Sequence, residues 1–340
     1  MEEKMLMTPG AYVLASVILF IIGFVGFFAN LIVIVMMCRD QRLWTPLNYI
    51  LFNLIISDFT VSILGNPFTL SSAIAMQWIF GHAMCIAYGF FMALLGIGSI
   101  STLTVLALER YLMVSRPLNR CALSSRAAIS LVGGIWIYAG FVTVPPLLGW
   151  GEYGPEAANL SCSVNWETRG HNSTSYIIYL FVLGFFIPLF VICFSYINII
   201  RTMKKSSLAM GGVSKAESRV VLMIAVMILA FLIAWTPYAI FALIVAFLDL
   251  EVSPALATVP AVFAKTSICY NPFIYVGLNT QFKQSWKKLL CMRSTEEFSM
   301  ERATTGVSAL SPSKYRLGDV TQTKYTRASV SDKNNGETNI

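Results

Sequence analysis

The chain has 340 residues, of which 56% are hydrophobic and only 12% are charged, and its mean hydropathy is +0.69. Because a soluble domain is about one quarter charged, this composition argues against a water-soluble enzyme and against disorder over most of the chain. The net charge of +7 suits either nucleic acid or an anionic membrane, and in so apolar a chain it favours the membrane over nucleic acid. Seven cysteines are too few for a disulfide scaffold.

Seven apolar stretches are long enough to cross a membrane, which takes about 20 helical residues. They lack the polar face of a soluble core helix and the alternation of a membrane β-strand. We therefore predict an all-α membrane protein, a seven-transmembrane helix bundle over residues 11–278. The expected spans are 11–37, 47–74, 84–108, 127–148, 175–200, 220–248 and 254–278.

Lysine and arginine gather in alternate connections between these spans. The first, third and fifth connections and the segment after the last span are rich in both, whereas the second has neither and the fourth has only Arg169. Positive charge marks the cytoplasmic side, so we expect a multi-pass protein of the cell membrane with residues 1–10 outside and the C-terminus in the cytoplasm.

The residues that follow the last span change character. Residues 279–292 set Phe282 and Trp286 against lysines, which predicts a short amphipathic eighth helix on the bilayer surface. Cys291 near its end is either a palmitoylation site or a free thiol. Residues 293–340 are polar and rich in Ser, Thr and Lys, so we expect a disordered cytoplasmic tail.

Two charged residues lie deep within the spans, where charge is costly and usually functional. Lys265 lies eleven residues beyond Pro254, roughly 16 Å along a helix and near the bilayer centre. Such a lysine either pairs with a carboxylate in a wet cavity or forms a Schiff base with a carbonyl ligand. Asp58 is expected to meet Asn30 and Asn271, around water, around a sodium ion or in a purely structural network.

A second group of polar residues marks the cytoplasmic ends of the spans. Glu109 and Arg110 close the third span and form either a switchable pair, with Glu217 as the second partner of the arginine, or a solvated interface pair. Near the end of the seventh span Pro272 interrupts the helix hydrogen bonds and predicts a hinge, as Pro237 does in the sixth.

Cysteines and sequons mark the opposite side. Cys85 and Cys162 both lie in segments expected to face the oxidising exterior, which predicts a disulfide between them. The loop that holds Cys162 also carries glycosylation sequons at Asn159 and Asn172, and Asn172 is the better candidate because it is farther from the bridge.

Taken together, these motifs resemble the rhodopsin-like G-protein-coupled receptors over about residues 12–292. Lys265, six residues before Asn271, resembles the retinal-binding lysine of opsins, and the loop 149–166 is similar to that of non-visual ciliary opsins, the encephalopsin and teleost multiple-tissue group. The residues that carry the resemblance are Asn30, Asp58, Cys85, Glu109, Arg110, Tyr111, Trp136, Cys162, Pro188, Tyr196, Trp235, Pro237 and those at 271–275.

The resemblance implies a light-activated receptor, not an enzyme, with retinal on Lys265 that is 11-cis in the dark and all-trans after light. It implies a heterotrimeric G protein of the Gi/Go or transducin class as partner, then arrestin and a receptor kinase. The implied activation switch is Glu109, Arg110, Tyr111, Tyr196, Glu217, Asn271, Pro272 and Tyr275. The implied retinal pocket is Met92, Ala93, Gly96, Ile97, Phe185, Phe231, Trp235, Tyr238 and Ala261.

The counterion departs from that of vertebrate visual pigments, which have a glutamate three residues after the first bridging cysteine. That residue is Tyr88 here, and Glu156 instead matches the second-loop counterion of bistable opsins. We expect Glu156 to be the counterion and the photoproduct to keep its chromophore; the alternative is a solvated Glu156 and a neutral dark Schiff base that absorbs in the ultraviolet. A retinal photoisomerase and a receptor for a diffusible ligand are the alternative functions.

Overall fold

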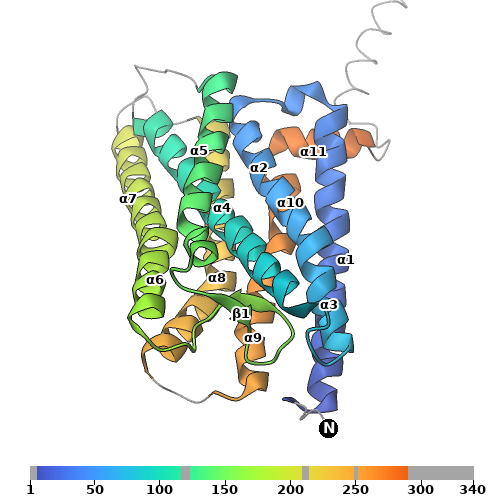
Figure 1. The fold of residues 1–340 in the computed structure, drawn as a ribbon. Coiled ribbons are helices and arrows are strands. Elements are labelled where there is room, and N and C mark those ends of the chain that lie inside the picture. The colour runs from blue at the N-terminus through green and yellow to red at the C-terminus, as the bar shows by residue number, and fades with distance from the viewer. Residues whose placement is uncertain (1–5, 116–122, 209–213, 249–251, 290–340) are drawn as a thin grey trace, which may run out of the picture. The chain divides into compact units, whose positions relative to one another are not determined.

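The computed structural model describes residues 6–115, 123–208, 214–248 and 252–289. These residues belong to one compact unit, 1–292, and form a bundle of helices (Figure 1). The expected tail, 293–340, and Cys291 lie outside the described residues.

The first six predicted spans are confirmed as helices. Within the described residues, six are long and apolar enough to cross a membrane. Two of these contain one π-helical segment, so each is formed from three consecutive elements. The six are α1 (Pro9–Arg39), α2–η2–α3 (Pro46–Thr60, Val61–Gly65, Asn66–Ile74), α4 (Gly81–Ser115), α5 (Ser125–Thr143), α6–η4–α7 (His171–Phe181, Val182–Phe186, Ile187–Leu208) and α8 (Lys215–Phe247).

The seventh span is not the single helix that we predicted. It consists of α9 (Pro254–Lys265) and α10 (Ser267–Leu278), which meet at Thr266. There the N–H of Thr266 bonds to the carbonyl of Phe263, 3.0 Å away and only three residues earlier. This tighter turn replaces the four-residue spacing of an α-helix and breaks the span directly after Lys265.

The fourth span is shorter than predicted. Helix α5 ends at Thr143 rather than near 148, because Pro145 and Pro146 have no N–H to continue the helix. The residues Pro145–Leu148 form a 3-10 turn, η3, which ends at Gly149 with φ 92°. The chain therefore leaves the helix earlier and enters the loop that carries Cys162.

A short hairpin crosses one end of the bundle, below α4 in Figure 1. Its strands are β1 (Tyr153–Pro155) and β2 (Cys162–Val164), antiparallel, with Gly154 opposite Ser163. The predicted disulfide between Cys85 and Cys162 is present and fixes the hairpin to α4. We name this the hairpin end of the bundle.

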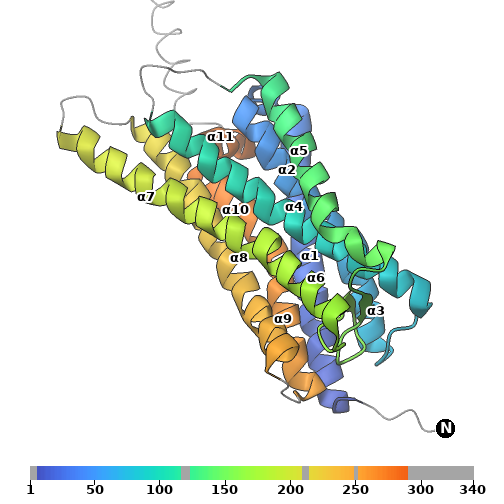
Figure 2. The same cartoon turned by 60° about the vertical axis from the view of Figure 1, so that its left-hand side comes forward.

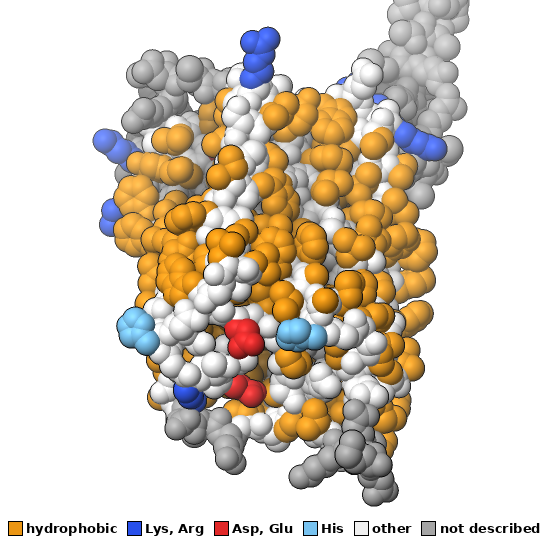
Figure 3. Space-filling model, viewed as in Figure 1, with side chains coloured by type: hydrophobic (Ala, Val, Ile, Leu, Met, Phe, Trp, Pro, Cys, Tyr) orange, Lys and Arg blue, Asp and Glu red, His pale blue; other side chains and the backbone are white. Residues whose placement is uncertain are grey.

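The opposite end carries the short helix α11 (Thr280–Leu289), which confirms the predicted amphipathic helix up to residue 289. Its Phe282 is fully buried and stacks on Tyr275 with 5.7 Å between ring centroids. Helix α4 packs against α2, α5, α7 and α8, and crosses the bundle obliquely in Figure 2. Apolar side chains cover the side of the bundle (Figure 3), as expected for a lipid-facing surface.

Candidate functional site

A cavity of about 180 Å³ lies inside the bundle near the hairpin end. All nine residues of the predicted pocket line it, together with Lys265 and Glu156. They come from α4, η4, α8 and α9 and from the hairpin loop, so residues more than 170 positions apart meet here. The predicted members are Met92, Ala93, Gly96, Ile97, Phe185, Phe231, Trp235, Tyr238 and Ala261.

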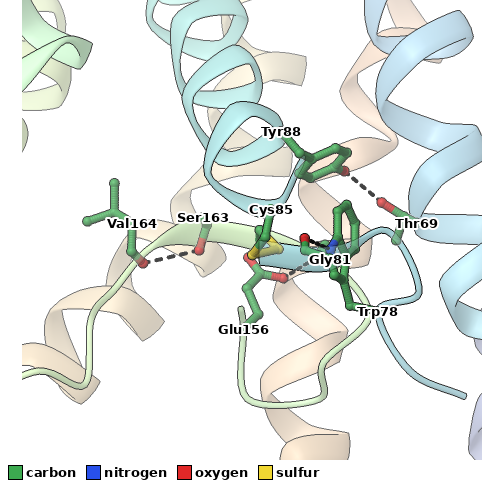
Figure 4. Close-up of a disulfide and its surroundings, with 10 residues drawn as sticks. Thr69, Trp78, Gly81, Cys85, Tyr88, Glu156, Ser163 and Val164 are labelled. Atoms are coloured by element: carbon green, nitrogen blue, oxygen red, sulfur yellow. Dashed lines mark hydrogen bonds between the residues drawn. A yellow bond between two sulfur atoms is a disulfide. The ribbon is translucent and has the colours of Figure 1, made fainter. Parts of the chain in front are cut away.

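Lys265 is the last residue of α9 and is half-buried, because its side chain lines the cavity. Its Nζ donates to the hydroxyl of Tyr88 over 3.2 Å. That hydroxyl also lies 2.6 Å from Oγ1 of Thr69 (Figure 4). It donates to the carbonyl of Gly65 over 3.2 Å. Tyr88 is thus the direct partner of the lysine, and η2 and α3 supply the groups that hold it.

Glu156 follows β1 and lies beside the disulfide (Figure 4). One carboxylate oxygen accepts a hydrogen bond from the hydroxyl of Tyr238 over 3.0 Å, and the other accepts one from Ser161. Glu156 and Lys265, which both belong to the part of the chain that the structure describes, line the same cavity, but no ion pair joins them directly. The predicted counterion therefore shares the cavity with the amine without contacting it.

Close packing shapes the middle of the cavity. A Cβ added to Gly96 would lie 3.3 Å from a ring carbon of Trp235, so the absence of a side chain lets the indole approach α4. The ring of Phe231 stacks on Trp235 at 5.7 Å between centroids. The indole N–H donates to Ser267 on α10 over 3.1 Å, which links α8 to the second half of the seventh span.

Sequence reasoning missed several lining residues, of which Trp166 makes the most informative contact. Its indole N–H donates to the hydroxyl of Tyr238 over 3.2 Å, beside the bond from Tyr238 to Glu156. Its position four residues after Cys162 was the available signal, because the disulfide ties this part of the loop to the bundle. Ser267 and Phe181 also line the cavity and were not predicted.

Asp58 lines the same cavity from α2 and has one of its two predicted partners. Asn271 donates to its carboxylate over 2.8 Å. Asn30 does not; its amide donates to the carbonyls of Gly26, at 2.8 Å, and Ile268, at 2.9 Å. The physical reason lies in Pro272, which has no N–H to bond the carbonyl four residues earlier, that of Ile268.

The predicted switch residues lie toward the α11 end. Arg110 is buried and binds both carboxylate oxygens of Glu109. Tyr196 on α7 donates to the carbonyl of Val221 on α8 over 3.1 Å. The ring of Tyr111 packs edge-on against the ring of Phe194 at 5.5 Å between centroids.

Glu217 has a structural role at the start of α8. It forms a capping box with Ser214, in which each side chain bonds the backbone N–H of the other. A bond from Glu217 to Arg110 stays a prediction. Tyr275 is fully buried on α10, beside α11.

The two sequons differ in accessibility. Asn172 is exposed in the first turn of α6, and its amide donates to the carbonyl of Gly149 over 3.0 Å. Asn159 is half-buried in the hairpin turn with φ 55°. Glycosylation at either residue stays a prediction, and the exposure favours Asn172.

Comparison with known proteins identifies the family. Residues 29–275 match the family described as 7 transmembrane receptor (rhodopsin family). A pinopsin of Columba livia is 40% identical over 286 residues, which cover 83% of this chain and 82% of the pinopsin. A rhodopsin of Sargocentron spiniferum is 35% identical over 315 residues, 91% of each chain.

A solved structure supports the same assignment. The crystal structure of squid rhodopsin superposes with a TM-score of 0.78 at 29% sequence identity, and the match covers 90% of this chain and 93% of that one. The family match extends over more than half of the chain, and the pinopsin matches most of it. The chain therefore belongs to the opsins, within the rhodopsin family of seven-transmembrane receptors.

Proposed function

We propose that this light-sensing, G-protein-coupled receptor holds retinal through a Schiff base on Lys265, with Glu156 as its counterion. Opsin membership makes the chain a multi-pass membrane receptor rather than an enzyme. The single observation that supports the retinal site is that Lys265 lines a mainly apolar cavity inside the bundle. Retinal supplies the absorption of light and the change of shape on isomerisation from 11-cis to all-trans.

The residues present fit such a ligand. An apolar polyene requires an apolar lining with few polar groups, and a lysine at one end fixes its orientation. Gly96 and Trp235 set the width of the middle of the cavity. Lys265 lies at the break between α9 and α10, so its backbone belongs to a turn that other helices hold in place.

The charged and hydroxyl groups divide into two sets. Tyr88 accepts a hydrogen bond from the amine and passes its own hydrogen toward Gly65 or Thr69. Tyr238 and Ser161 each donate to Glu156, which holds the carboxylate on the cavity side of the loop. A cationic ligand linkage in an apolar site requires an anion nearby, and Glu156 lines the same cavity as Lys265.

Signal transfer follows from the helices that the cavity joins. A ligand that changes shape against Trp235 shifts the equilibrium between two positions of α8. This helix carries Pro237 in its interior. At the α11 end the bond between Glu109 and Arg110 holds the resting arrangement, and its release frees Arg110 for a G-protein α subunit. We propose coupling to the Gi/Go or transducin class and a photoproduct that keeps its chromophore, as in bistable opsins.

The remaining proposals concern topology and regulation. The hairpin end faces the exterior and the α11 end the cytoplasm, because the connections rich in lysine and arginine lie at the α11 end. Residues 1–10 are then the extracellular N-terminus, 11–278 the retinal-binding bundle and 293–340 a cytoplasmic tail. Serines and threonines of the tail are phosphorylated by a receptor kinase and recruit arrestin, Cys291 carries palmitate, and Asn172 carries the glycan.

The test is the absorption spectrum of the purified protein with 11-cis retinal, before and after a flash. The parent protein should form a pigment band that Lys265→Ala lacks. Glu156→Gln should move a visible band into the ultraviolet, whereas Glu152→Gln, on an exposed loop carboxylate, should leave it in place. A second colour should reverse the photoproduct. If the parent protein forms no band, the retinal proposal is wrong and the alternative, a receptor for a diffusible ligand, is favoured.

A further inference from the structure

A second, smaller cavity adjoins the first on the hairpin side. Its volume is about 40 Å³, and it shares Glu156, Trp166, Tyr238 and Lys265 with the larger cavity. Its other walls come from the loop segments after β1 and after β2, from the C-terminal half of α8 and from the first turns of α9. They include Asn165, Glu167, Phe241, Val245, Ala257 and Thr258.

This cavity is lined both by residues of the protein surface and by Lys265. Two of its lining residues, Pro155 and Glu167, are exposed, whereas Lys265 is half-buried. A buried water needs about 10–15 Å³ and two to four polar partners, so the volume has room for about three waters. Polar groups of the lining, among them Glu156, Asn165 and Thr258, can bond such waters.

Arg169 joins the two walls at the outer end. It follows β2 in the loop, and its guanidinium donates to the carbonyl of Ala246 and, over 3.0 Å, to that of Val245. These carbonyls belong to the last turn of α8, where they have no partner within the helix and where the helix dipole favours a cation. Val245 also lines the second cavity, so this bond connects loop and helix at its rim.

We propose that the second cavity is an aqueous passage from the hairpin end to Lys265, admitting water and small polar nucleophiles, and that Arg169 is the positioning residue that keeps it narrow. The proposal rests on Lys265 carrying retinal as proposed above. The passage lies between the loop and α8, so separating these two walls widens it. Separation breaks the Arg169 bonds, and removing the guanidinium should therefore make opening more frequent.

Reaction with hydroxylamine in the dark is the first test. Hydroxylamine replaces the amine of Lys265 on the retinal carbon, so retinal oxime and the free amine of Lys265 are the products and nothing else is consumed. Loss of the pigment band gives the rate. Arg169→Ala should raise it about fivefold, since charged hydrogen bonds are strong but this side chain is partly exposed. Arg169→Lys, which keeps the charge without the planar fork, should be intermediate.

Filling the passage should have the opposite effect. Ala257 is buried, lines the second cavity and not the first, and lies on α9. Ala257→Leu should slow the reaction about fivefold, and Ala257→Val is the milder replacement if leucine impairs folding. Thr168→Ala is the matched control for Arg169, because its backbone N–H, rather than its side chain, makes the hydrogen bond to Asn165. O-benzylhydroxylamine is too large for this cavity, so any reaction with it takes another route. Its rate should therefore be the same in every variant.

A second measurement needs no retinal. Formaldehyde with cyanoborohydride methylates lysine amines, with release of water and transfer of hydride from the cyanoborohydride, and mass spectrometry reports the methylated fraction at Lys265. In retinal-free protein in lipid nanodiscs, Arg169→Ala should increase this fraction and Ala257→Leu should decrease it, whereas pyridoxal phosphate, a bulky aldehyde, should label Lys265 in none of them.

The outcomes separate the two proposals. Parental rates in both Arg169→Ala and Ala257→Leu, for hydroxylamine and for formaldehyde, would overturn the passage, because the reagents would then reach Lys265 by another route. If no pigment forms, the retinal proposal fails and the methylation of Lys265 alone decides whether the passage exists.

Discussion

The bond between Glu109 and Arg110 should set the dark activity of the receptor. Both side chains are only 10% exposed, and the guanidinium reaches both carboxylate oxygens. In Glu109→Gln the side chain keeps its shape and one acceptor but loses its charge. A charged hydrogen bond contributes about 1.5–3 kcal/mol and a neutral one about 0.5–1.5 kcal/mol, so weakening one of the two bonds alone costs the resting arrangement about 1 kcal/mol, and losing the other adds to it.

A loss of about 1 kcal/mol raises the ratio of active to resting receptor roughly fivefold, provided that the active fraction is small. Nucleotide exchange on a Gi/Go-class α subunit, measured in the dark with 11-cis retinal bound, gives this ratio. The rate in saturating light should not change, because the equilibrium is then already on the active side. Glu152→Gln is the control for an exposed carboxylate. Dark activity of Glu109→Gln equal to that of the parent would refute the role of this pair.

Three further outcomes are expected. Serine at both disulfide cysteines, 77 residues apart, should lower the free energy of unfolding by at most about 4.5 kcal/mol, measured by thermal unfolding in detergent. The hydrogen bond from Ser285 holds the pKa of Asp40 below its ordinary value of 3.8, so it stabilises the ionised form. The melting-temperature difference between parent and Ser285→Ala should therefore be constant from about pH 5 to pH 8 and shrink as the pH falls through the lowered pKa of Asp40. Gly96→Leu should prevent pigment formation, whereas Gly133→Leu, with open space around its Cα, should not.

Hydropathy was sufficient to predict the helices of the bundle, because it reports which segments of the chain avoid water. It located six helices and the amphipathic α11. It overran the fourth span, where two prolines end α5 within an apolar stretch. Proline stops a helix through a missing N–H, and an average over apolar residues does not contain that information.

The cavity was predicted in a different way. Its nine residues came from the resemblance to opsins, since nothing in the local sequence of Gly96 or Ala261 marks a ligand site. The contact from Trp166 to Tyr238 joins residues 72 positions apart, and the bond from Arg169 to Ala246 spans 77. Such pairs depend on how the loop lies over the bundle, and the disulfide that fixes the loop restricts only the residues near Cys162.

A hydrogen bond that Pro272 removes from α10 is replaced by a side chain of another helix. Pro272 leaves the carbonyl of Ile268 without its helical donor, and Asn30 supplies the replacement from α1. Because the amide of Asn30 donates to backbone carbonyls, it does not bond Asp58. The carboxylate of Asp58 accepts a hydrogen bond from Asn271 instead. Asn30 thus fixes α1 to the part of α10 that follows the break after Lys265. Asn30→Ala should therefore loosen the seventh span and lower pigment stability, while Asn30→Asp, which offers no N–H to the carbonyl, should not restore it.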